Sequence, residues 1–255
     1  MAPASYSLDR KVRAANLDYR VLGSTEPDNP DLPTFVLVHG IGVSHRYFSR
    51  LHAELEKTAN VYSIDAPGFG GLPKPDVSPT VPEVAQGLGA VLAGLVLQPV
   101  ILVGHSMGAQ WVVEVARQRP ELVKSVVAIG PVCDDTRRTL PWQGLALGLD
   151  ILGEPLSTNI VVFTDYLRSG TIWFLREARH MIDYRIDLAV REMSQPLLVI
   201  RGGNDPIAGL DWCRRLKSIA RVGSLAIVPG HRHVVQFTAP RAVASAIRAF
   251  VDKTS

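Results

Sequence analysis

The sequence has no long apolar run, no cluster of one charge and only two cysteines. No window reaches the ~18 consecutive apolar residues of a membrane-spanning helix, so no membrane span is expected. Lysine and arginine total 27 against 24 acidic residues, and no basic run of the kind that follows a phosphate backbone occurs. Nucleic acid is therefore not an expected partner. Cys133 and Cys213 leave one disulfide open but give no framework of bridges.

The first ten residues also lack the apolar segment of a secretory signal. We therefore expect a cytoplasmic protein. Internal repeats and low-complexity tracts are absent from the sequence. The 255 residues are 47% hydrophobic and 20% charged, which is ordinary for a globular protein and long enough for one large domain.

Short apolar runs alternate with helical patterns along most of the chain. Strands are predicted at residues 6–12, 17–22, 34–38, 60–64, 99–103, 125–129, 196–200 and 224–228, and helices at 49–58, 81–97, 106–119, 211–220 and 240–251. This alternation predicts a mainly parallel sheet with helices on both faces. In such sheets ligands bind beyond the carboxyl ends of the strands.

The alternation stops between residues 133 and 193, where no clear strand is found. This segment is rich in aromatic side chains, which argues against a disordered linker. Strand and helix patterns return after it, so it divides the pattern into two parts.

A serine pattern follows the third buried apolar run. Residues 100–103 lead into Gly104-His105-Ser106-Met107-Gly108, and a helical pattern comes next. A serine in this strand–turn–helix context sits on a tight, strained turn that lifts its hydroxyl clear of the sheet. The N-terminus of the following helix favours developing negative charge. A turn that only connects a strand to a helix is the alternative, but the context favours Ser106 as a catalytic nucleophile.

Five motifs occur together in a specific order. They are His39-Gly40-Ile41-Gly42, Asp65-Ala66-Pro67-Gly68-Phe69-Gly70, Gly104-His105-Ser106-Met107-Gly108, Gly203-Asn204-Asp205-Pro206 and Gly230-His231-Arg232-His233. With them the sequence resembles the α/β-hydrolase fold superfamily outside residues 133–193. The resemblance implies a mostly parallel eight-stranded sheet with helices on both faces. It also implies a core domain of residues 1–132 and 194–255, with a helical cap at 133–193 inserted after the sixth strand.

The same resemblance implies a catalytic triad. A serine hydroxyl needs a base, and the base needs an orienting acid. Asp205 matches the acid position of the family, while Asp134 and Asp135 stand at the alternative acid position that some members use. His233 matches the base better than His231, because of its distance from the proline that opens the last helix. Arg232 departs from the glycine that many members carry directly before the base.

The oxyanion of acyl transfer needs two backbone N–H donors, which the resemblance assigns to Ile41 and Met107. His39 is expected to hold the oxyanion loop by hydrogen bonds, and Asp65 to tie down its own Pro-Gly turn. His105 is expected to point away from the reacting atom. Trp111 is expected in the core.

Four aromatic residues of the 133–193 segment are candidates to line the substrate pocket. They are Trp142, Phe163, Trp173 and Phe174. Packing of the cap onto the core is an equally good interpretation of each.

These features predict a serine hydrolase that cleaves a carboxylic ester of a small, largely apolar substrate through an acyl-enzyme. No metal-ligating cluster or nucleotide-binding fingerprint is present in the sequence, so neither metal nor cofactor is expected. The same triad serves carbon–carbon bond hydrolases, lactonases, perhydrolases and thioesterases, and some relatives of this fold are small-ligand receptors. A homodimer is compatible with the sequence.

Overall fold

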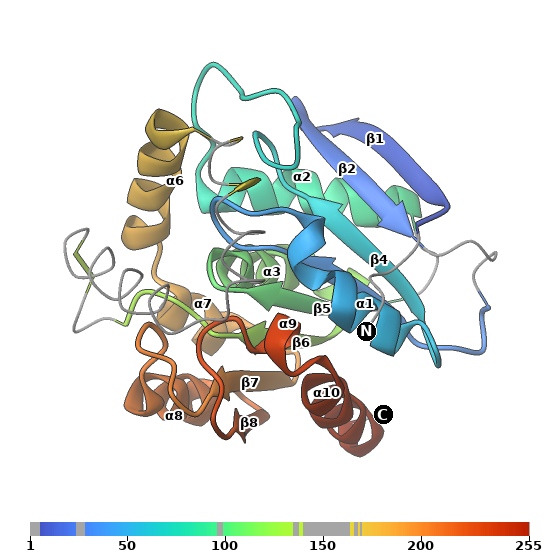
Figure 1. Cartoon of the computed structure of the whole chain (residues 1–255), viewed down its shortest axis with the longest axis vertical. Coiled ribbons are helices and arrows are strands. Elements are labelled where there is room, and N and C mark those ends of the chain that lie inside the picture. The colour runs from blue at the N-terminus through green and yellow to red at the C-terminus, as the bar shows by residue number, and fades with distance from the viewer. Residues whose placement is uncertain are drawn as a thin grey trace.

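The computed structural model describes residues 6–23, 29–95, 99–134, 138–139, 164–165, 168 and 170–254. Within these ranges eight strands form one sheet in the order β1-β2-β4-β3-β5-β6-β7-β8 (Figure 1). The strands are β1 Leu8–Ala14, β2 Leu17–Gly23, β3 Thr34–Val38, β4 Asn60–Asp65, β5 Val100–His105, β6 Val123–Ile129, β7 Leu197–Gly202 and β8 Gly223–Val228. All eight overlap the strands predicted from the apolar runs.

The sheet is parallel from β4 to β8, and only β2 and β1 run antiparallel to their neighbours. The predicted mostly parallel sheet is therefore confirmed. After β3 the chain crosses to β4 on one side, and it later returns to place β5 on the other side of β3. Such a reversal opens a crevice at the carboxyl ends of the two strands, where ligands bind in open α/β sheets. His39 follows β3 there, and Ser106 follows β5.

Alternate side chains of the central strands point to opposite faces, and each face has its own apolar cluster. Val36, Leu102 and Val126 belong to one cluster, whereas Leu37 and Val103 belong to the other. The first face is covered by α2 Val81–Leu95, α3 Met107–Gln118, α7 Ile186–Glu192 and α8 Leu210–Ile219, and the second by α1 Ser49–Leu55, α9 Val235–Thr238 and α10 Pro240–Thr254 (Figure 1). Helices on both faces explain why the central strands are continuous apolar runs.

Helix α2 begins where the sequence predicts. The carboxylate of Glu83 accepts hydrogen bonds from both the backbone N–H and the hydroxyl of Thr80, each at 2.8 Å. A side chain in the first turn that reaches back to the cap residue in this way satisfies N–H groups that the helix leaves unpaired.

Helix α6, Thr171–Asp183, is the gold helix of Figure 1 and lies in the predicted cap segment. Gln110 of α3 donates a hydrogen bond to the carbonyl of Met181 at 2.8 Å, and the Tyr184 hydroxyl donates to Glu114 of α3 at 2.7 Å. The bonds from Gln110 and to Glu114 attach the C-terminal end of α6 to α3 of the core. Within the cap segment, the Arg138 guanidinium donates to the carbonyls of Ile182 and Tyr184 at the same end of α6. The division into core and cap domains stays a prediction.

In the part of the chain that is described, no helix is both long and apolar enough to cross a membrane. Cys133 and Cys213 are both free thiols and both buried. The disulfide that the sequence left open is therefore not formed.

Candidate active site

Ser106 lies on the tight turn between β5 and α3. Its backbone has φ 56° and ψ −120°, a left-handed conformation that costs a non-glycine residue about 1–3 kcal/mol. Its N–H donates to the carbonyl of Ile129 on β6 at 2.9 Å, which fixes the turn to the neighbouring strand. The turn places the residue at the N-terminus of α3, as the sequence predicts.

The loop after β3 packs directly against this turn. A Cβ on Gly108 would lie 2.3 Å from the carbonyl oxygens of both Val38 and His39. A Cβ on Gly40 would lie 2.9 Å from the Cβ of Ser106. Only residues without side chains allow these approaches. The backbone at His39 and Gly40 is therefore held close to the Ser106 turn.

His233 and Asp205 form a buried hydrogen-bonded pair. His233 Nδ1 donates to Asp205 Oδ2 at 2.9 Å, and the two residues are only 4% and 5% exposed. The other carboxylate oxygen accepts from the backbone N–H groups of Ile207 at 2.8 Å and Ala208 at 2.9 Å. Asp205 thus both orients a histidine and closes an Asx turn, two roles that the sequence presents as alternatives. With Nδ1 donating, Nε2 of His233 is left as the basic nitrogen.

Arg201, which sequence reasoning missed, holds the loop of Asp205 by hydrogen bonds to its backbone carbonyls. Its buried guanidinium donates to the carbonyls of Ala208 at 2.9 Å, Asp205 at 3.0 Å and Gly203 at 3.2 Å. The signal available in the sequence is a single charged residue inside the apolar run of β7, four positions before the acid.

His105 packs beside His233. The two ring centroids are 4.7 Å apart, and Nε2 of His105 donates to the carbonyl of His233 at 3.1 Å. Burial, with a smaller contribution from His233, holds the pKa of His105 well below its usual value, so that the ring is a neutral donor. The sequence predicts that His105 points away from the reacting atom but does not indicate that it supports His233.

His39 holds the loop after β3, the predicted oxyanion loop, with both ring nitrogens. Nδ1 donates to the carbonyl of Gly40 at 2.7 Å, and Nε2 accepts the N–H of Ala66 at 3.0 Å. Complete burial lowers the pKa of His39, which keeps it in this neutral form. A ring with both nitrogens occupied is not free to act as a base.

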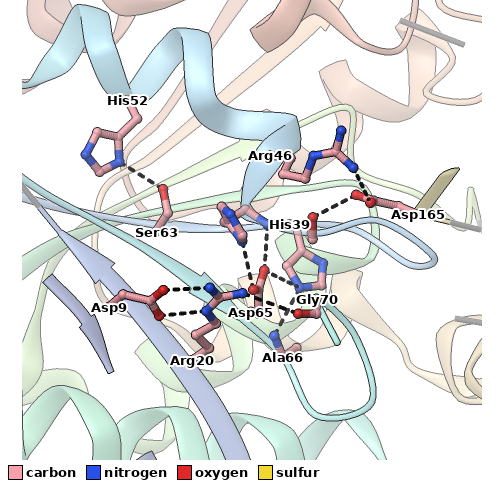
Figure 2. Close-up of polar contacts among 12 residues, drawn as sticks. Asp9, Arg20, His39, Arg46, His52, Ser63, Asp65, Ala66, Gly70 and Asp165 are labelled. Carbon is pink, nitrogen blue, oxygen red and sulfur yellow. Dashed lines mark hydrogen bonds and ion pairs between the residues drawn. The ribbon is translucent and has the colours of Figure 1, made fainter. Parts of the chain in front are cut away.

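Asp65 does not tie down its own turn, contrary to expectation. Its two oxygens accept from the backbone N–H of His45 at 2.6 Å and from His45 Nδ1 at 2.8 Å (Figure 2). The Pro-Gly turn instead closes through its own backbone, by the bond from the Phe69 N–H to the Ala66 carbonyl. Burial opposes the charge on Asp65, but the bonds from His45 outweigh it and lower the pKa of the carboxyl.

The backbone N–H groups of Ile41 and Met107 form no hydrogen bond with any other residue for which a position is described. Met107 is the first residue of α3, whose opening N–H groups have no partner within the helix. Their assignment as oxyanion donors stays a prediction.

Residues 35–246 match the sequence profile of the alpha/beta hydrolase family. The chain belongs to this family.

Known proteins similar to this alpha/beta hydrolase carry several activities. The 2-(acetamidomethylene)succinate hydrolase of Mesorhizobium japonicum is 25% identical over 250 residues, which are 86% of this chain and 88% of that protein. The enol-lactonase from Burkholderia xenovorans LB400 has a TM-score of 0.80 at 16% identity, covering 95% of this chain and all of that one (100%). The esterase RhEst1 from Rhodococcus sp. ECU1013 has a TM-score of 0.78 at 16% identity, covering 97% and 99%. The two structures show the same fold.

In this alpha/beta hydrolase the alternative residues for the acid and the base, Asp134 and His231, bind other side chains. Asp134 binds Arg215 at 3.0 Å, and His231 Nδ1 contacts the Thr238 hydroxyl at 2.9 Å. Asp135 lies outside the described residues. No group of three or more His, Cys, Asp or Glu side chains in the described ranges could hold a metal ion.

Of the four aromatic candidates, two can be placed. Trp173 is buried, and its ring lies 6.3 Å from that of Phe69, which in turn contacts His39 at 5.4 Å. Phe174 is half-buried against the apolar core. Trp142 and Phe163 lie outside the described residues. Trp111 is fully buried, as expected.

Proposed function

We propose that this chain is a serine hydrolase that cleaves a carboxylic ester of a small, largely apolar substrate through an acyl-enzyme. The observation that carries the proposal is the buried Asp205–His233 pair, set at the same edge of the sheet as Ser106. A hydroxyl on a strained turn, a base and an orienting acid are the parts that nucleophilic acyl transfer requires.

The proposed reaction has two halves. His233 Nε2 removes the proton of the Ser106 hydroxyl while Oγ attacks the carbonyl carbon, and Asp205 stabilises the imidazolium. The same proton then passes from His233 to the leaving alcohol, which leaves the acyl group on Oγ. In the second half His233 removes a proton from water, the resulting hydroxide attacks the acyl carbon, and Ser106 regains its proton as the acid departs.

Two N–H groups support the charge that develops on the carbonyl oxygen. Those of Met107 and Ile41 are the proposed donors, and each such donor stabilises a transition state by roughly 3 kcal/mol. Trp142, Phe163, Trp173 and Phe174 remain candidates for the pocket that selects the acyl group. Trp173 is supported by its contact with Phe69, beside the oxyanion loop. No step in this proposal needs a cofactor.

The similar proteins support a second candidate function, lactone or carbon–carbon bond hydrolysis, about as well as ester hydrolysis. An enol-lactonase and a 2-(acetamidomethylene)succinate hydrolase stand beside an esterase among the similar proteins. The same groups would then open a lactone or cleave a carbon–carbon bond next to a carbonyl. Perhydrolase and thioesterase activities require the same nucleophile. A small-ligand receptor on this fold is the alternative from another class.

Labelling by a fluorophosphonate separates an enzyme from a receptor. The probe should modify Ser106 in the folded protein and leave the Ser106→Ala variant unmodified. Folded wild-type protein that does not react would contradict the proposal.

A substrate panel then separates the hydrolase classes. We expect short p-nitrophenyl esters to be turned over faster than long ones, enol-lactones and vinylogous diketones. Turnover of a lactone or a diketone without turnover of simple esters would replace the esterase by that activity.

A further inference from the structure

The turn of residues 44–46 follows the predicted oxyanion loop and bonds to two buried carboxylates, Asp65 and Asp165, which are labelled with Arg46 in Figure 2. Asp65, at the end of β4, binds the backbone and the ring of His45. Asp165, in the segment between β6 and α6, binds the residues on either side of His45. Its Oδ2 accepts from the Ser44 hydroxyl at 2.7 Å and its Oδ1 from the Arg46 guanidinium at 3.0 Å. The 44–46 turn is thus held from the sheet on one side and from the predicted cap on the other.

The carboxylate of Asp165 and its bond to Ser44 are shielded from water, whereas the side chain of Arg46 is 39% exposed. The side chain of Asp165 is 4% exposed, and Ser44 is 2% exposed. A buried carboxylate costs several kcal/mol unless its oxygens are paired, so it favours the one arrangement in which both partners are in place. Charge-assisted bonds of this length also fix geometry more closely than neutral ones. Arg46 additionally donates to the Thr164 hydroxyl at 3.3 Å, which fixes the same segment.

Both sides of the candidate active site depend on where this turn lies. Toward the N-terminus it continues into the backbone at Gly40 that packs on Ser106. Toward the C-terminus the Tyr47 N–H bonds to the Ser44 carbonyl at 2.9 Å and begins the short 3-10 helix His45–Phe48. The ring of Tyr47 lies 5.2 Å from that of His105, which supports His233. A displacement of the turn therefore reaches the oxyanion donor and the base together.

We infer that Asp165 is a positioning residue for acyl transfer, which holds the 44–46 turn so that the Ile41 N–H points at the oxyanion. This inference rests on the proposed function, because it requires the loop to bind a developing negative charge. A group that aligns an oxyanion donor acts on the transition state and not on the bound substrate. Its removal should lower the maximum rate and leave the half-saturating concentration unchanged.

The test uses a fluorophosphonate with a short alkyl chain, which reacts with the serine whatever the natural substrate is. Asp165→Asn keeps the shape of the side chain and removes its charge, and Ser44→Ala removes one bond with little change in volume. Complete loss of an oxyanion donor slows catalysis about 10²–10³-fold, so partial misplacement should lower the maximum labelling rate about tenfold in each variant. The half-saturating concentration should change by less than about twofold, and the double variant should be little slower than the slower single variant.

Asp187→Asn is the matched control. Asp187 also binds an arginine, Arg185, at 2.6 Å, but it lies at the start of α7 with no contact to the turn. This variant should label at the wild-type rate.

The outcomes separate the two proposals. Wild-type protein that does not label overturns both. Wild-type labelling at Ser106 with unchanged maximum rates in both variants overturns the role of Asp165 and leaves the hydrolase intact. A raised half-saturating concentration, or a lowered melting temperature alone, at an unchanged maximum rate would mean that Asp165 only attaches the cap. If Asp165→Asn does not fold, the rate of Ser44→Ala decides.

Discussion

His231 and His233 are two residues apart and have different surroundings. His233 is buried, donates a hydrogen bond to Asp205 and packs against the ring of His105. His231 is half-buried and contacts the hydroxyl of Thr238 at the end of α9. A base needs an acid that orients it and stabilises its charged form, and of these two histidines His233 has one among the described residues.

Replacing the two histidines in turn tests this difference. His233→Ala should lower the labelling rate and kcat at least about 10⁴-fold, because the serine then has no base. His231→Ala should keep activity within about threefold and lose about 1 kcal/mol of stability with its hydrogen bond. Steady-state kinetics and thermal unfolding measure both effects. The reverse order of activities would transfer the role of base to His231.

Residues that belong to a motif can be predicted from the sequence, whereas residues that position other residues through contacts distant in the sequence cannot. Ser106, Asp205 and His233 follow the ends of strands in an order that the sequence displays, and their catalytic roles stay predictions. Asp165 meets Ser44 across 121 positions, and nothing in the local sequence of either residue indicates that contact. Sequence reasoning favours near partners and so predicts that Asp65 holds its own turn, but its bonds go to His45, 20 residues away.

Among the elements, helix α6 carries a buried acid without a basic partner among the bonds described for it. Glu177 is 1% exposed, and its Oε1 accepts from the hydroxyl of Ser78, in the loop before α2, at 2.6 Å. Burial raises the pKa of Glu177 to about 7, although the bond from Ser78 acts in the opposite direction. Burial therefore favours the protonated carboxyl in the folded protein, against the preference of the Ser78 hydrogen bond for the ionised form.

Stability should fall with rising pH through this group. The folded state holds the proton of Glu177 up to about pH 7, whereas an unfolded glutamic acid loses it near its ordinary pKa of 4.5. The folded state thus binds more protons in between, and a difference of this size corresponds to about 3 kcal/mol lost between pH 4.5 and 7. Chemical denaturation at pH 5 and pH 8 should show this loss in the wild type but not in Glu177→Gln.

Glu192→Gln is the control for this series, since Glu192 is 62% exposed. It should follow the wild type at both pH values. Equal losses in wild type and Glu177→Gln would mean that Glu177 is already ionised in the folded protein at low pH.

Helices and strands can be predicted from the sequence when they are long enough and buried enough to show a repeating apolar pattern. The strands and the helices α2, α3, α8 and α10 are predicted because several residues repeat one period, and their bounds differ from the structure by only a few positions. Helix α6 is not predicted individually, although it has 13 residues. The His45–Phe48 helix and α9 have four residues each, too few for a period to show. The aromatic segment after β6 gave no period at all, and Trp142 and Phe163 lie outside the described residues.

At the scale of the whole molecule, the sheet and its two helical layers follow from the order of apolar runs. The central strands are buried on both faces, so nearly every residue in them is apolar and the signal is strong. The family assignment agrees with this architecture. The substrate does not follow in the same way, because one fold carries many specificities through the segments attached to it.

The left-handed backbone at Ser106 implies that this protein is not as stable as its fold permits. Glycine adopts φ 56° without steric cost, so Ser106→Gly should relieve about 1–3 kcal/mol of strain, while the more flexible unfolded chain returns less than about 1 kcal/mol of it. Compared with Ser106→Ala, which lacks the hydroxyl equally, Ser106→Gly should melt about 3 °C higher. At Ser125, on β6, the same pair of substitutions should rank the other way, and the same ranking at both sites would refute the argument. Selection for stability alone would thus favour glycine at position 106, which lacks the hydroxyl of the proposed nucleophile.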